Sequence, residues 1–347
     1  MESHEAAELF DQAVEQLRRV VDSGGPGDSD DDGSDLLRHA AGSGAVAVRL
    51  ALAHLADADR VVRAAACDLL GFASDVHGDD LRSDAATALI ALADTEVDPE
   101  VHWSIARALG ATCDPRALPT LVALAGSPDK DVRFQVAAAL PMVLIDDHPP
   151  EDGVAALIVL SADADPEVRE WATFGLGWLS TADGDAVRRA LWDRTRDTDD
   201  EVRAEGARGL ARRRDARAVP LVRDLLAWEG VHTFTFQAAA YLADASLLPL
   251  LDGFDPTADG VVDALRECDP VRRGERDESA WQVLETVHQL RPDLRVAIFG
   301  ERCDLGLYLD IDDGSDISGH WFLDGLLNRA GDDPVRAAEL AIADLHR

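Results

Sequence analysis

The sequence predicts an all-α protein built as a solenoid of helical hairpins, with about six repeats and a less regular C-terminal cap. One short phrase recurs roughly every 35 residues, and amphipathic helical segments lie between its copies. Apolar residues make up 47% of the chain, yet only 5% of residues are aromatic, because Ala, Leu and Val dominate. Self-similarity at such a period is typical of stacked helical repeats. Small apolar side chains allow their helices to pack closely.

The N-terminal segment precedes the repeats. Residues 1–22 are acidic and amphipathic and are expected to form a helix. Residues 23–34 lack apolar side chains and are expected to form a flexible acidic loop. The alternating aspartates from Asp28 to Gly33 resemble the start of a calcium-binding loop, but His39 holds the twelfth position, where a glutamate is required. We therefore expect no metal site in this loop.

The recurring phrase is an aspartate followed, four residues later, by an arginine or histidine that valine directly precedes. We call this arginine or histidine the anchor. The anchors are Arg63, His102, Arg133, Arg169 and Arg203, and a later copy ends at Arg336. The aspartate is a good helix N-cap, because its carboxylate accepts hydrogen bonds from N–H groups of the first turn. Pro99 and Pro166 suit the position after a cap, where no N–H is needed. Each phrase therefore predicts the start of a helix.

The residues after each anchor define one face of that helix. The residue four past the anchor is always small, and the residue seven past it is always leucine. With the valine before the anchor, these positions share one face of a 3.6-residue helix. Gly71, Gly110, Gly177 and Pro141 are expected to end the helices. Second helices are expected at residues 116–125, 154–161 and 217–228.

This unit resembles the HEAT family, in particular the short HEAT-like repeats of phycobilisome lyases, most closely over residues 109–140. The resemblance implies a right-handed solenoid, which we place at residues 35–255. It also implies that the recurring aspartates and anchors form a ladder that joins neighbouring repeats. The expected ladder residues are Asp59, Arg63, Asp98, His102, Asp129, Arg133, Asp165, Arg169, Asp199 and Arg203. His102 departs from the pattern, so its rung is expected to be weaker or pH-sensitive.

The C-terminal part is less regular. A sixth repeat without an aspartate cap is expected at residues 231–242, and residues 256–347 are expected to form an irregular helical region. Within it, residues 270–278 are interpreted as an exposed loop. Residues 294–299 and 305–311 are short apolar runs that fit either strands or helix pieces. Residues 321–347 return to a helix-turn-helix pattern and are expected to cap the solenoid.

The net charge of −34 constrains the partners. Acidic and basic residues are mixed along the chain, so the whole surface is expected to repel nucleic acid, whose binding requires clustered Lys and Arg. The surface would attract a basic protein instead. The alternative is an acidic proteome, because Lys130 is the only lysine beside 32 arginines. We found no membrane span and no signal peptide, and we expect a cytoplasmic protein. Cys67, Cys113, Cys268 and Cys303 are expected to be reduced and mostly buried.

No motif for catalysis or cofactor binding stands out. We found no nucleophile elbow, phosphate-binding glycine loop or HExxH sequence. The acidic cluster at residues 310–316 has no better metal-ligand spacing than the first. Trp103 and Arg107 have the i, i+4 spacing of a helical site such as HEAT-like DNA glycosylases use, but no carboxylate in the sequence pattern completes it. We therefore expect no enzymatic activity, no cofactor and no metal, and keep a glycosylase-like or bilin-lyase-like enzyme or enzyme accessory as the alternative.

The positions one, two and five past the anchor point away from the buried face and are expected to line the concave groove of the solenoid. Five aromatic residues occupy such positions, and exposed apolar side chains in a row usually mark an interaction site. The opposing interpretation is that neighbouring repeats bury them. The candidate groove residues are Trp103, Arg107, Phe134, Glu170, Trp171, Phe174, Arg208 and Phe234. The sequence thus favours a non-catalytic scaffold that binds a protein or peptide. The finer hypothesis is an acidic protein that neutralises a basic one, as immunity proteins do.

Overall fold

The computed structural model describes residues 3–23, 33–76, 79–144, 148–228, 231–300, 306–314 and 318–345. The chain divides into two compact units, Met1–Gly206 and Ala207–Arg347. The predicted flexible loop and its calcium-like aspartates lie almost wholly outside the described residues, as do Cys303 and Asp316.

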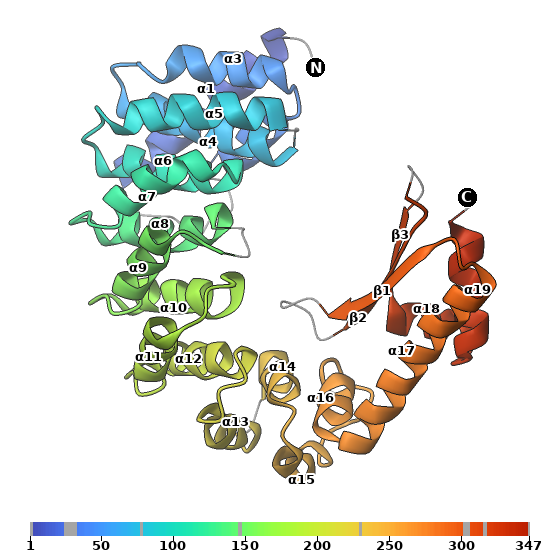
Figure 1. Cartoon of the computed structure of the whole chain (residues 1–347). Helices are drawn as coiled ribbons and strands as arrows, with labels where there is room; N and C mark the ends of the chain where they lie inside the picture. Colours follow the sequence, from blue (N-terminus) through green and yellow to red (C-terminus); the bar gives the residue numbers. More distant parts are fainter. Residues whose placement is uncertain are drawn as a thin grey trace. The chain divides into compact units, whose positions relative to one another are not determined.

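The first unit is made of helices alone in its described part (Figure 1). They are α1 (Ser3–Ser23), α2 (Ser34–Ala41), α3 (Ala45–His54), α4 (Arg60–Val76), α5 (Asp79–Ala93), α6 (Pro99–Thr112), α7 (Leu118–Leu124), α8 (Lys130–Val143), α9 (Glu151–Leu160), α10 (Pro166–Phe174), α11 (Asp185–Arg194) and the first half of α12 (Asp200–Arg212). A 3₁₀ turn at Pro115–Ala117 precedes α7, and a π-helical turn at Gly175–Leu179 extends α10.

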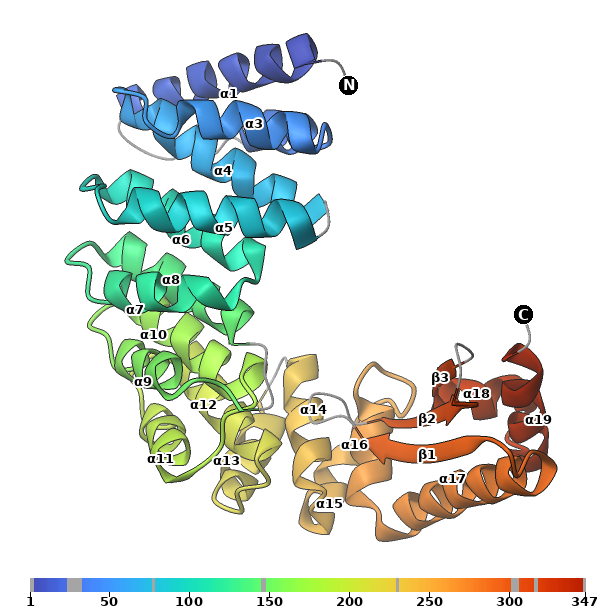
Figure 2. The same cartoon turned by 45° about the horizontal axis from the view of Figure 1, so that its top comes forward.

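The helices of the first unit form two layers. The helices that carry the anchors, α4, α6, α8, α10 and α12, are called B helices here, and α4, α6, α8 and α10 pack side by side in one layer. The helices between them, α3, α5, α7, α9 and α11, are called A helices and form the other layer (Figures 1 and 2). This alternation confirms the predicted solenoid of helical hairpins.

The predicted buried face of the B helices is confirmed. The valines before the anchors, the small residues four past them and the leucines seven past them are all buried. The predicted N-caps are confirmed as well. The carboxylates of Asp59, Asp98, Asp129, Asp165 and Asp199 each accept a hydrogen bond from a backbone N–H two residues further on. These bonds satisfy N–H groups that the first helical turn leaves unpaired.

The prediction that glycines end these helices was wrong. Gly71 and Gly110 lie inside α4 and α6, where they allow the next B helix to come close. A Cβ atom added to Gly71 would lie 3.1 Å from Cα of Ala108, and one added to Gly110 would lie 3.1 Å from Cα of Ala139. Gly177 lies within the π-helical turn, and Pro141 lies inside the last turn of α8 and does not stop it. The glycines therefore serve packing between helices.

The second unit begins with helices and ends with a small α/β element. Its elements are the second half of α12, α13 (Ala218–Leu226), α14 (Thr233–Leu242), a 3₁₀ turn (Ala245–Leu247), α15 (Leu248–Leu251), α16 (Val261–Cys268), α17 (Pro270–Leu290), β1 (Arg295–Gly300), β2 (Leu307–Asp312), β3 (Ser318–Phe322), α18 (Leu323–Ala330) and α19 (Pro334–Asp344). The expected sixth repeat at residues 231–242 corresponds to α14, which no side chain caps.

A three-stranded antiparallel sheet with the order β1-β2-β3 lies in the C-terminal part. One face packs on α17, α18 and α19 through a core that includes Leu309, Ile311 and Leu323. On the other face, the rings of Phe299, Tyr308 and Phe322 follow one another across the three strands. The two apolar runs left open by the sequence are thus strands, and the predicted helix-turn-helix exists but covers this sheet.

The interpretation of residues 270–278 as an exposed loop was wrong, because they form the start of α17. Asp269 is the N-cap of this helix and accepts a hydrogen bond from the N–H of Val271, and Pro270 follows the cap. Arg273 lies four residues past Asp269 and donates to the carbonyl of Glu267, as the anchors do in their own loops, although Arg272 and not valine precedes it. The dense charges and Gly274 concealed this helix.

Candidate interaction surface

The anchors join neighbouring repeats, but not through the aspartates that the sequence suggested. Those aspartates are occupied as N-caps. Each rung instead pairs an anchor with the acid two residues before the next cap. Arg63 binds Glu96, with Nε–Oε2 at 2.7 Å and Nη2–Oε1 at 3.2 Å. The equivalent pair of Arg133 and Asp163 has Nε–Oδ2 at 2.7 Å and Nη2–Oδ1 at 3.0 Å.

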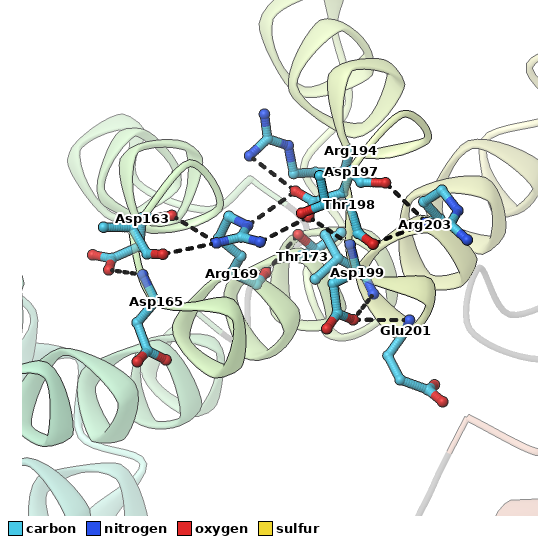
Figure 3. A network of polar contacts seen from close by, with 12 residues as sticks. Asp163, Asp165, Arg169, Thr173, Arg194, Asp197, Thr198, Asp199, Glu201 and Arg203 are labelled. Atoms are coloured by element: carbon cyan, nitrogen blue, oxygen red, sulfur yellow. Dashed lines mark hydrogen bonds and ion pairs between the residues drawn. The ribbon is translucent and has the colours of Figure 1, made fainter.

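The next rung joins Arg169 to Asp197, with Nε–Oδ2 at 2.9 Å and Nη2–Oδ1 at 2.8 Å (Figure 3). The same guanidinium donates through Nη1 to the carbonyl oxygens of Asp163 and Ala164, in the loop before its own helix. Arg203 binds the loop carbonyls of Asp197 and Thr198 in the same way. Four anchors therefore fix their own loops, namely Arg63, Arg133, Arg169 and Arg203. The first three of them also hold the loop of the following repeat.

The rung acids have a second role. Their carboxylates accept hydrogen bonds from the N–H of the following cap, as Glu96 does from Asp98. Burial raises the pKa of Glu96, but its bonds from Arg63 and from the N–H groups of Asp98 and Val97 outweigh burial and lower it to about 2. The pKa of Asp163 and of Asp197 is lowered by the same opposition of burial and anchor hydrogen bonds.

One rung of the ladder lacks both of its usual residues, the arginine and the acid. His102 stands where the other B helices have arginine, and Ser127 stands where the other loops have an acid. The Ser127 hydroxyl keeps one part of the acid's role, because it accepts a hydrogen bond from the N–H of Asp129 at 3.2 Å. The sequence carried the signal for this ladder: Asp57, Glu96, Asp163 and Asp197 all lie two residues before a cap, whereas Ser127 does not match.

Three of the predicted groove residues come together on the B helices. The ring of Trp171 in α10 meets the ring of Phe134 in α8 edge-on, with centroids 5.8 Å apart. It meets the ring of Phe174, one turn further along α10, in the same way at 5.8 Å. Trp171 is 38% exposed, and the two phenylalanines are half-buried. We call these three side chains the aromatic cluster.

Glu170 lies beside this cluster, one residue before Trp171. Among the described residues its carboxylate has no hydrogen bond or ion pair. Burial raises the pKa of Glu170, and the nearby charges of Glu201, Asp199 and Glu167 raise it further. This is the environment of a carboxylate that lacks a cation, so a positive group placed next to it would be stabilised.

Trp103 and Arg107 lie on α6 and do not join the aromatic cluster. The guanidinium of Arg107 lies between the rings of Trp103 and Phe72, at 5.4 and 4.6 Å from their centroids. It forms an ion pair with Asp68 of α4, with Nη2–Oδ1 at 2.9 Å. A carboxylate that the sequence pattern did not show thus accompanies Trp103 and Arg107, because it comes from the preceding repeat and cannot be seen within one helix.

The last two predicted groove residues lie in the second unit. Phe234 is half-exposed, and the guanidinium of Arg208 lies 4.1 Å from the centre of its ring. Arg208 is only 4% exposed, so the expectation that its side chain lines an open groove was wrong. A register within one helix gives the direction of a side chain but not what a neighbouring helix places over it.

The described part of the chain offers little for other chemistry. Within it, no three His, Cys, Asp or Glu side chains are grouped as a metal ion would require. Cys67, Cys113 and Cys268 are free thiols, and burial raises the pKa of Cys268 to about 12. None of the described helices is long and apolar enough to cross a bilayer.

The comparisons with known proteins agree with this architecture. The family model for HEAT repeats matches residues 46–141 and 154–243, more than half of the chain. The protein YibA of Escherichia coli K12 is 32% identical over 124 residues, which cover 36% of this chain and 43% of that protein. The chain thus matches less than half the length of this relative.

The crystal structure of Escherichia coli YibA gives a TM-score of 0.54 at 23% identity and covers 75% of this chain and 96% of the other, which shows a shared fold. The complex of CpcE and CpcF of phycocyanin lyase from Nostoc sp. gives a TM-score of 0.42 at 20% identity, covering 63% of this chain and 92% of the other. On the family match and the repeat geometry together, the chain belongs to the HEAT-repeat family.

Proposed function

We propose that this chain is a non-catalytic scaffold that binds a protein or peptide partner through the B helices of its first unit, and that the partner presents basic side chains there. The observation that carries the proposal is the aromatic cluster of Phe134, Trp171 and Phe174 beside the unpaired carboxylate of Glu170. HEAT repeats generally mediate protein interactions, which supports the same class of function.

The aromatic cluster and Glu170 together favour a cationic side chain whose guanidinium group or aliphatic carbons can pack on the aromatic rings. An arginine of the partner could stack on the ring of Trp171 and pair with Glu170, so that one side chain gains both a cation–π contact and a charge-assisted hydrogen bond. Residues of this kind supply most of the binding energy at protein interfaces. Burial and nearby carboxylates raise the pKa of Glu170, which shows that its negative charge is unfavourable in the free protein. A positive side chain of the partner placed beside Glu170 would offset this cost.

The net charge of −34 supports a basic partner, because opposite charge accelerates association. The finer proposal is an acidic protein that neutralises a basic one, as immunity proteins do. The competing account is an acidic proteome. If the charge serves binding, raising the salt concentration should slow association with the partner, because salt screens long-range attraction. Association that does not depend on salt would remove the electrostatic version.

Photo-crosslinking tests where the partner binds. A photoreactive amino acid at position 171 should crosslink one specific protein in the native lysate. Trp192 of α11 provides the matched control, because it is a half-buried tryptophan on an A helix whose ring lies 4.4 Å from the guanidinium of Arg196. The same protein crosslinked equally from positions 171 and 192 would contradict a binding surface on the B helices.

A further inference from the structure

A small pocket lies in the first unit, lined by residues of α1, α4 and α6 and of the start of α8. Its volume is about 230 Å³. Leu17 and Val21 of α1 and Val61 of α4 give it an apolar floor, and the indole of Trp103 in α6 forms a wall. Pockets for drug-sized molecules are typically larger, roughly 300–1,000 Å³, so this one suits a small group with an aliphatic stem.

The polar side of the pocket is acidic. Asp68, Glu100, Asp129 and Asp131 belong to its lining, and no lysine, arginine or histidine is among the described residues that line it. Asp68 and Glu100 hold Arg107 and Arg60, whose side chains lie outside the lining. Asp131 is the most open of the four: its side chain is 70% exposed and pairs with the exposed Lys130, with Nζ–Oδ1 at 3.4 Å. A cation that enters would therefore meet an aromatic wall and carboxylates, and would compete with Lys130 for Asp131.

Ser104 provides an independent sign that the pocket takes a polar ligand. It is 3% exposed and lines the pocket. Its hydroxyl makes no hydrogen bond with any residue that the structure describes and is not one of the fully buried polar atoms, so it is open to a ligand in the pocket. A ligand with an N–H donor would satisfy this hydroxyl, whose oxygen can accept a hydrogen bond.

We propose that this pocket binds a protonated primary amine on a short alkyl stem. The stem lies on Leu17, Val21 and Val61, and the ammonium group lies against Trp103 within reach of Ser104 and the acidic rim. The same chemistry is offered by a free alkylamine and by a lysine side chain of another protein. This inference does not depend on the proposed function, because it concerns different residues and requires no protein partner.

Nuclear magnetic resonance of the indole N–H groups tests the proposal on the full chain. The Trp103 signal is assigned from its loss in Trp103→Phe, and n-butylammonium, 1-butanol and butanoate are then titrated at constant ionic strength. We expect a saturable shift of the Trp103 signal with n-butylammonium alone. An equal shift with 1-butanol, or no saturable shift with the amine, would overturn the proposal.

Two variants locate the cation. Asp131→Asn should weaken n-butylammonium binding by about threefold or more, as expected for the loss of one partly exposed charge. Asp193→Asn, a change of a similarly exposed acid on α11, should leave it unchanged. Equal affinities in both variants would overturn the assignment of the acidic rim.

A final arm separates the two sources of the amine. A lysine blocked at both backbone ends carries the same stem and ammonium group. If it binds as tightly as n-butylammonium, the pocket accepts a side chain of another protein; if only n-butylammonium binds, the pocket is closed to a backbone and takes free amines. Binding of neither compound refutes the proposal.

Discussion

Arg169 and Asp197 form a bidentate ion pair between consecutive repeats, with both nitrogen–oxygen distances below 3.0 Å and both side chains largely buried (Figure 3). The same guanidinium also binds two loop carbonyls of its own repeat. One side chain thus holds the two turns that fix the spacing between neighbouring hairpins.

Removal of this pair should destabilise the protein. Arg169→Ala leaves the carboxylate of Asp197 without its main partner, and hydrogen bonds to charged groups contribute about 1.5–3 kcal/mol each. We therefore expect a loss of about 2–3 kcal/mol in the free energy of unfolding, measured by chemical denaturation. Lys130→Ala is the control, because Lys130 also reaches an acid of the next repeat but lies exposed. Equal effects of the two changes would show that the rung is no stronger than a surface ion pair.

The missing rung can be restored by two substitutions together. His102→Arg with Ser127→Asp recreates the pair found at Arg63–Glu96 and Arg133–Asp163. We expect the double variant to gain about 1 kcal/mol or more in the free energy of unfolding beyond the sum of the two single-variant changes, a typical coupling for side chains in contact. Thermal and urea unfolding of all four proteins measures the coupling. A coupling of zero would mean that the loop at Ser127 cannot adopt the rung geometry.

Because of the ladder, we expect the free energy of unfolding to fall at acid pH. The pKa of Glu96 is lowered to about 2 in the folded protein from its ordinary value of 4.5, so the folded state binds this proton less readily than the unfolded state. Its stabilising effect is therefore present above about pH 4.5 and is lost as the pH falls towards 2. Glu96→Gln should flatten the loss of stability across this range, as urea unfolding at successive pH values would show. An unchanged slope would contradict the role of Glu96.

Because the B helices pack closely, we expect the effects of substitutions at Pro141 and Gly175 on stability to depend on each other. A Cβ atom added to Gly175 would lie 2.6 Å from Cγ of Pro141. Gly175→Ala should therefore destabilise the protein by about 1–3 kcal/mol through overpacking, although alanine is otherwise the better helix former. In the background of Pro141→Ala the same change should be neutral or stabilising. Unfolding curves of the four combinations check this, and an equal cost in both backgrounds would refute steric coupling.

The sequence predicted the repeats well because their determinants are local. The cap aspartate, the buried valine and leucine and the small residue all act within one helix, and all proved correct. The rung acids were also visible in the sequence, but their pairing with the anchors depends on how one repeat stacks on the next. The third strand, Ser318–Phe322, was not predicted, because a five-residue segment with glycine and histidine is a strand only through its pairing with β2.

The candidate site shows the same division. The helical register correctly predicted that Trp171 is exposed and that it lies near Phe134 and Phe174. It could not show that Phe234 lies over Arg208 or that Asp68 binds Arg107, because both contacts join residues of different helices.

The role of the aromatic cluster in binding is tested by the affinity of the crosslinked partner for wild type and for Trp171→Ala, measured together with the melting temperatures of both proteins. We expect Trp171→Ala to weaken binding by about 30-fold or more, the effect of losing an interface residue that contributes about 2 kcal/mol. Its melting temperature should stay close to that of Trp192→Ala, which should bind normally. Unchanged affinity in Trp171→Ala, or a large drop in its melting temperature alone, would show that the aromatic cluster is packing and not a binding surface.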